Sequence, residues 1–125
     1  MDLKKLENKI NIIKNKLRIK KFDEVIRDSK LLIKKFSNQQ ILYNILSLAY
    51  QQKGENDKSI SLLTNALKKS PKNIFFLNNI GVSHYNKKNL VEAEYYFNRA
   101  LEINPNYINA LNNLGNLKKD LNLVD

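Results

Sequence analysis

The stretch from Leu77 to Pro105 decides the fold, and it reads LNNIGVSHYNKKNLVEAEYYFNRALEINP. A weaker copy lies about 34 residues earlier and another copy begins about 34 residues later. The pair Asn78-Asn79 returns as Asn112-Asn113, and Pro105 corresponds to Pro71. A fixed period of this size is typical of helical repeats that stack, so that each unit is buried by its neighbours. The sequence therefore predicts an all-α repeat protein.

The composition fits a single, mostly helical domain. The chain has 125 residues, 42% of them hydrophobic, with only 3 glycines and 2 prolines to form turns. It has no cysteine, which excludes disulfides, a thiol nucleophile and a zinc–thiolate site. It contains no 18-residue apolar run and no apolar stretch behind its first lysines, so we expect no membrane span and a cytoplasmic location.

The net charge of +10 raises the question of nucleic-acid binding. The basic residues are nearly all lysines, and the chain is also rich in Asn and Ile. These three amino acids share A/T-rich codons, so genome composition is the favoured explanation of the charge. An RNA-binding module that uses the basic N-terminal helices is the alternative, and it requires a steep loss of affinity with salt.

Apolar spacing predicts seven helices, interrupted by turn residues. The first has its apolar residues at three- and four-residue spacings: Leu3, Leu6, Ile10, Ile13 and Leu17. Gly54 can close a helix in the left-handed conformation, and Asn89 with Glu92 resembles a capping box. The expected helices are 3–19, 22–36, 40–53, 56–69, 74–87, 90–103 and 108–121.

These residues resemble the tetratricopeptide repeat, a 34-residue helix-turn-helix unit. The signature positions of the best copy are Leu77, Ile80, Gly81, His84, Ala93, Phe97, Ala100 and Pro105. The resemblance implies a right-handed α-solenoid of antiparallel helix pairs that forms one domain over 1–125. It comprises a degenerate repeat at 6–39, repeats at 40–73 and 74–107, and the first helix of an incomplete repeat at 108–125. In the degenerate repeat, Lys9 and Lys16 replace signature residues.

No set of residues predicts catalysis, a cofactor or a metal, so we expect a protein that is not an enzyme. His84 is the only histidine, and its spacing places it on the buried seam as a core residue with satisfied hydrogen bonds. The chain has no glycine-rich phosphate loop.

The resemblance implies a concave groove lined by the first helix of each repeat. An apolar strip with amides beside it suits an extended peptide, which predicts a protein–protein interaction module with a protein or peptide partner. For Phe75 and Val82, contacts between neighbouring first helices are an equally good explanation. The groove residues are expected to be Asn44, Phe75, Asn78, Asn79, Val82, Tyr85, Asn112, Asn113 and Asn116.

Two binding modes of the family can be compared with this groove. A clamp of Lys, Arg and Asn holds acidic C-terminal tails of chaperones. Here its slots contain Asn44, which fits, but Ile10, Asn78 and Val82 stand where basic residues are expected. A better match is the asparagine ladder in the tetratricopeptide region of O-GlcNAc transferase. Its slots hold Asn11, Asn79 and Asn113, and Ile45 interrupts the series.

Two further possibilities concern the C-terminal part. The chain could be the substrate-recognition region of a larger glycosyl- or sulfo-transferase. Alternatively, the last helix could support self-association, because no second helix covers Leu111, Leu114, Leu121 and Leu123.

Overall fold

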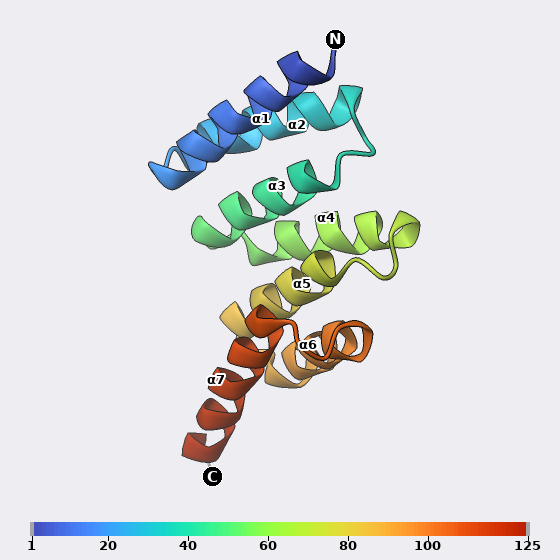
Figure 1. The fold of residues 1–125 in the computed structure, drawn as a ribbon. Coiled ribbons are helices and arrows are strands. Elements are labelled where there is room, and N and C mark those ends of the chain that lie inside the picture. The colour runs from blue at the N-terminus through green and yellow to red at the C-terminus, as the bar shows by residue number, and fades with distance from the viewer. Residues whose placement is uncertain (1, 125) are drawn as a thin grey trace. The chain divides into compact units, whose positions relative to one another are not determined.

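The computed structural model describes residues 2–124, and all its regular structure in this range is helical (Figure 1). The helices are α1 (Leu3–Arg18), α2 (Phe22–Lys35), α3 (Gln40–Gln52), α4 (Asn56–Lys69), α5 (Ile74–Asn86), α6 (Leu90–Ile103) and α7 (Ile108–Val124). They fall into two compact units, one ending at Glu55 and one beginning at Asn56. The expected helices are all present in the described range, although α7 continues to Val124, beyond the predicted end at residue 121.

The N-terminal unit consists of α1, α2 and α3, which pack around one aliphatic core. The predicted stripe of α1 supplies Leu6, Ile10 and Ile13 to this core, but Leu3 is 80% exposed and lies outside it. Burial of each aliphatic side chain contributes about 1.5–3 kcal/mol before entropic costs. The other buried members of the core are Val25, Leu32, Leu42, Ile45 and Ala49.

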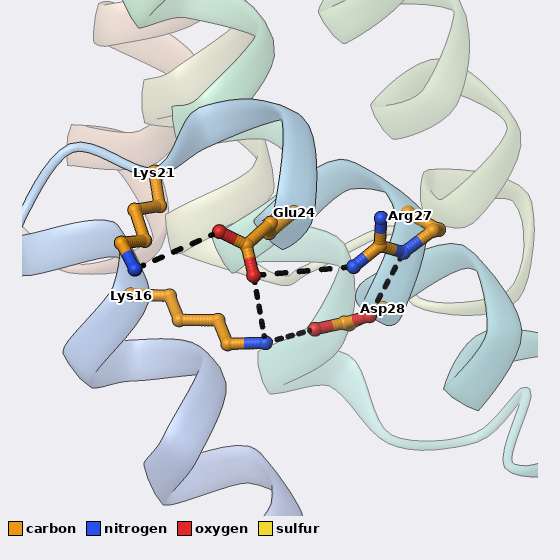
Figure 2. A network of polar contacts seen from close by, with 5 residues as sticks. All are labelled: Lys16, Lys21, Glu24, Arg27 and Asp28. Carbon is orange, nitrogen blue, oxygen red and sulfur yellow. Dashed lines mark hydrogen bonds and ion pairs between the residues drawn. The ribbon is translucent and has the colours of Figure 1, made fainter.

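An ion-pair network joins α1 to α2 and includes one lysine of the basic α1 helix. Lys16 Nζ lies 2.8 Å from Asp28 Oδ2 and 3.3 Å from Glu24 Oε1. Figure 2 shows Glu24 also facing Lys21 and Arg27. The hydrogen bond with Asp28 raises the pKa of Lys16. Burial opposes ionisation of Asp28, but its contacts with Lys16 and Arg27 prevail and lower its pKa.

The C-terminal unit consists of α4 to α7, in which each helix packs against the next. Its tightest contact is between α5 and α6, where Gly81 faces Phe97: a Cβ built on Gly81 would lie 2.5 Å from the phenylalanine Cε1. Phe97 is fully buried and packs with Ala93 and Leu117. The absence of a side chain at Gly81 therefore permits the close crossing of α5 and α6.

One ion pair occurs in both units at the same repeat position. In the N-terminal unit, Lys53 at the end of α3 pairs with Asp23 at the start of α2. In the C-terminal unit, Lys87 after α5 pairs with Asp57 at the start of α4. The partners are 30 residues apart in both cases, so each pair joins a first helix to the second helix that precedes it.

The turns between helices also repeat, and three of them contain a residue with positive φ. Gly54 has φ of 77°, as predicted, but Lys20 and Lys88 occupy the same position in the other repeats with φ of 66° and 68°. The predicted capping box is wrong, because the Asn89 side chain makes no cap hydrogen bond on α6. Asp2 on α1 and Asn73 on α5 do cap their helices with side-chain hydrogen bonds.

We expect Lys88→Gly to stabilise the protein. The left-handed conformation costs an L-residue about 1–2 kcal/mol, whereas glycine adopts it freely but loses more entropy on folding. The net gain should be about 0.5–1 kcal/mol in the free energy of unfolding, measured by urea titration. Gly54→Ala is the matched reverse change and should destabilise the protein, because its backbone has the same conformation. Equal effects of the two substitutions would contradict this explanation.

Candidate peptide-binding surface

The candidate surface is formed by α5 and α7, whose facing residues meet at three places. At one end, the rings of Phe75 and Tyr107 pack edge to face with centroids 5.7 Å apart. In the middle, Asn113 Nδ2 donates to Asn78 Oδ1 over 3.0 Å. At the other end, the Tyr85 hydroxyl donates to Asp120 Oδ2. The two polar contacts tie the helices together and set their spacing.

The expectation that Asn78 faces an open groove is wrong. Its side chain is only 5% exposed, and its oxygen accepts the hydrogen bond from Asn113, which is itself half-buried. A buried amide must find partners for its polar atoms, and here a second asparagine supplies one. This pair therefore has a structural role between the two helices.

Other predicted residues remain accessible on the same helices. Phe75 is 51% exposed despite its contact with Tyr107, so its ring still presents apolar area. Asn112 and Asn116 are exposed on α7. Exposed amides can donate to a peptide carbonyl and accept from a peptide N–H. The accessible part of the surface thus combines an aromatic edge with neutral hydrogen-bonding groups.

Three predicted residues have more limited access. Val82 is half-buried and packs against the cluster that contains Phe97 and Leu117, as the alternative of helix–helix contact predicted. Asn79 is half-buried and already engaged in an interaction. Asn44 lies on α3 in the N-terminal unit, where it is also half-buried and engaged. Among the predicted residues, Asn78 of α5 and Asn113 of α7 are in direct contact.

Tyr107 and Asp120 belong to this surface but were not among the predicted residues. Asp120 lies 35 residues after Tyr85, and Asn113 lies 35 residues after Asn78. The two hydrogen bonds between α5 and α7 thus share one offset, close to the 34-residue spacing of the repeat. The hydrogen bond to Asp120 raises the pKa of Tyr85, so the phenol stays protonated as a donor.

His84 lies away from this surface and packs against α6. It is half-buried and its ring stacks on Tyr96 at a centroid distance of 5.7 Å. Burial lowers its pKa, which favours the neutral ring. The expectation of satisfied hydrogen bonds is not met, since its buried Nδ1 has no partner among the described residues. A stacked, neutral ring is consistent with a packing role.

Residues 2–124 contain neither a cluster of metal ligands nor a membrane-spanning helix. Over this range no three His, Cys, Asp or Glu side chains gather where they could hold a metal ion. None of the helices in this range combines the length and apolar character needed to cross a bilayer. Asp57 forms an ion pair with Lys87, and Asp120 accepts a hydrogen bond from Tyr85.

The geometry defines a helical-repeat protein with an exposed aromatic edge on α5 and exposed amides on α7. Residues 41–73 and residues 74–107 each match the tetratricopeptide repeat family. Together these matches span more than half of the 125 residues, and the chain belongs to this family. The prediction of an all-α helical-repeat solenoid is thereby confirmed, because solved tetratricopeptide domains resemble the chain over most of its length.

Individual relatives are more distant. The first tetratricopeptide domain of human RPAP3 has a TM-score of 0.83 and 20% identity, covering 89% of this chain and 87% of its own. The first such domain of Spaghetti (RPAP3), bound to the HSP90 peptide SRMEEVD, has a TM-score of 0.83 and 20% identity, covering 97% and 96%. Protein adenylyltransferase Fic of Aedes aegypti is 34% identical over 80 residues, 62% of this chain. The match spans only 16% of that enzyme.

Proposed function

We propose that this chain is a protein-interaction module that binds an extended, uncharged peptide segment across α5 and α7. The observation that carries the proposal is the exposure of Phe75 on α5 and of Asn112 and Asn116 on α7, two helices that contact each other. An amide that forms hydrogen bonds with a peptide backbone does not distinguish one side chain of the peptide from another. Selectivity for particular peptides would therefore come from the aromatic edge. Membership of a family of interaction repeats supports this function.

The charge of this face argues for a neutral ligand. The peptide bound by the Spaghetti domain, SRMEEVD, ends in acidic residues. An acidic tail needs basic partners, which form the strong charge-assisted hydrogen bonds to carboxylates. On α5 the slots that would supply them hold Asn78 and Val82, one buried and one half-buried. We therefore expect this chain to prefer an uncharged segment over an acidic tail.

The proposed role is non-catalytic. The single histidine stacks on Tyr96 and the chain has no cysteine. The likeness to an adenylyltransferase covers 16% of that enzyme, so it supports a shared repeat rather than a shared reaction.

The test is a selection of displayed peptides against the intact chain, followed by calorimetric titration of the selected peptides. We expect uncharged, extended sequences to be selected, and SRMEEVD to bind far more weakly. A variant that combines Phe75→Ala, Asn112→Ala and Asn116→Ala should lose affinity by about thirtyfold or more. Each net hydrogen bond contributes about 0.5–1.5 kcal/mol, and 1.4 kcal/mol corresponds to tenfold.

The matched control is Asn65→Ala with Asn98→Ala, which removes exposed amides from α4 and α6. This control should bind the selected peptides like the unmodified chain. Selection of acidic tails, or an equal loss of affinity in the control and the triple variant, would overturn the proposed site. Thermal melts of all variants separate lost binding from lost folding.

A further inference from the structure

The outer face of α6, made of Val91, Tyr95, Asn98 and Glu102, is exposed along the whole helix. Val91 is 80% exposed and Tyr95, one turn later, is 57% exposed. The residues that α6 buries lie on its opposite side and are Ala93, Phe97 and Ala100. Exposed apolar area that is rimmed by polar residues is typical of an interaction surface.

The packing of one repeat on the next leaves this face open. The equivalent positions of α4, 34 residues before Val91, Tyr95 and Arg99, hold Asp57, Ser61 and Asn65. These three polar side chains are exposed although a complete helix pair, α5 and α6, follows α4. The outer face is therefore a solvent-facing part of the repeat, and on α6 two of its polar residues are replaced by apolar ones.

The ring of Tyr95 is held in place by its neighbours. It packs edge to face with the ring of Tyr96, with centroids 5.1 Å apart, and Arg99 Cζ lies 5.7 Å from its centroid. Tyr96 in turn stacks on His84 of α5. A side chain that is already ordered loses little conformational entropy when a partner covers it. Tyrosines in such positions contribute strongly to binding at protein interfaces.

The spacing of the outer face matches the seam of a two-helix coiled coil. Its four residues are separated by steps of four, three and four positions, which lets a second helix lie along α6. In such pairs, charged residues that flank the seam determine which partner binds. The positions that flank the apolar end of this seam hold Glu92 and Glu94.

The glutamates of α6 supply negative charge to this face. Glu92, Glu94 and Glu102 form no ion pair within residues 2–124, whereas Asp57 at the start of α4 pairs with Lys87. The one basic residue of α6, Arg99, lies over the rings of Tyr95 and Tyr96. In a chain of net charge +10, this helix thus combines an apolar patch with available carboxylates.

We propose that the outer face of α6 binds one amphipathic helix of a partner protein, with lysine or arginine on both sides of its apolar stripe. The stripe covers Val91 and Tyr95, and the basic side chains pair with Glu92 and Glu94. A nucleic acid, an anionic membrane or the same face of a second copy would meet like charges here. The face lies on the side of α6 away from α5, so the inference does not depend on the proposed peptide-binding function.

The probe is a synthetic helix about three heptads long, with leucine at both seam positions, lysine at both flanking positions and alanine elsewhere. The flanking lysines keep copies of the probe from pairing with each other. Its affinity for the intact chain is measured by fluorescence anisotropy. We expect saturable binding that Val91→Ser with Tyr95→Ser weakens about thirtyfold or more, because a central tyrosine is a typical hot spot. Tyr95→Phe keeps the ring and should bind like the unmodified chain.

The second arm of the test concerns charge. Glu92→Gln with Glu94→Gln should weaken binding of the lysine probe about fivefold, a modest effect because exposed ion pairs are weak. The matched control, Ser61→Lys with Asn65→Lys, makes the same change in net charge on the outer face of α4. This control should bind the probe nearly as well as the unmodified chain, since salt screens distant charges. A probe with glutamate at the flanking positions should prefer the variant Glu92→Lys with Glu94→Lys.

Three outcomes would overturn the proposal. The lysine probe could fail to bind the unmodified chain, or could bind the double serine variant equally well. The glutamine variant and its control on α4 could weaken binding equally, which would assign the binding to overall charge. Sedimentation could reveal a dimer that the double serine variant dissociates, which would assign the face to a second copy. If thermal melts show that the serine variant is unfolded, the glutamine variant still decides.

Discussion

Gly81→Ala should destabilise the protein strongly, although alanine is the better helix former. The added Cβ would lie 2.5 and 2.6 Å from two ring carbons of Phe97, distances that no relaxed contact tolerates. Phe97 is fully buried, so its ring cannot move into solvent. Overpacking of this kind costs about 1–3 kcal/mol or more, which outweighs the gain of about 0.5–1 kcal/mol from removing a helical glycine. A urea titration should show this loss of stability as a lower urea concentration at the midpoint of unfolding.

Gly115→Ala is the matched control and should have the opposite sign. It makes the same chemical change at the equivalent position of α7, where the new methyl group meets nothing within 4 Å. Only the helix-propensity gain remains, about 0.5–1 kcal/mol. The difference between the two variants isolates the steric contact with Phe97. Equal stabilisation of both variants would show that α5 and α6 do not approach as closely as the structure places them.

Asn78→Ala should also reduce stability, because this asparagine is 5% exposed and accepts the hydrogen bond from Asn113. Removing the acceptor leaves a small cavity and a donor without its partner, with an expected loss of about 1–3 kcal/mol in the free energy of unfolding. An exposed asparagine on α7 provides the comparison: Asn112→Ala should change stability by no more than about 0.5 kcal/mol.

The same pair of variants tests the division of roles among the asparagines. Asn78→Ala should lower the thermal midpoint, whereas Asn112→Ala should affect peptide binding and leave the midpoint in place. If Asn78→Ala melts like the unmodified chain, the contact with Asn113 contributes nothing to the fold. Amide exchange on α7 gives an independent readout, since loss of the contact should increase exchange around Asn113.

The fold could be predicted from the sequence because the repeat supplies the same information several times. The spacing of Leu77, Gly81 and Phe97 specifies a close helix crossing, and the structure contains it. Turn residues are less informative. The glycine at position 54 indicated a left-handed conformation in advance. Lys20 and Lys88 adopt the same conformation, but no residue near them in the sequence indicates it. These two lysines are identified as left-handed positions only because each lies 34 residues from Gly54.

The candidate surface was harder to predict, because a helical residue's neighbours depend on which helix lies beside it. Asn78 and Asn112 look alike in sequence, yet one is buried against Asn113 and the other is exposed. Lys16 is one of many lysines near the N-terminus, and its local sequence does not distinguish it as the one that forms ion pairs. The carboxylates that hold it lie on the following helix.

The recurring ion pairs Lys53–Asp23 and Lys87–Asp57 bear on how such a chain can lengthen during evolution. Each lysine pairs with an aspartate 30 residues earlier. A tandem duplication of one 34-residue segment would therefore keep a lysine and an aspartate at the spacing that the ion pair needs. An inserted copy would join its neighbours without new mutations. At the next position in this series the two slots hold Leu121 and Val91, both exposed, and the electrostatic connection is absent there. Duplications that begin upstream of Asp57 should therefore be tolerated better than those that begin at Val91.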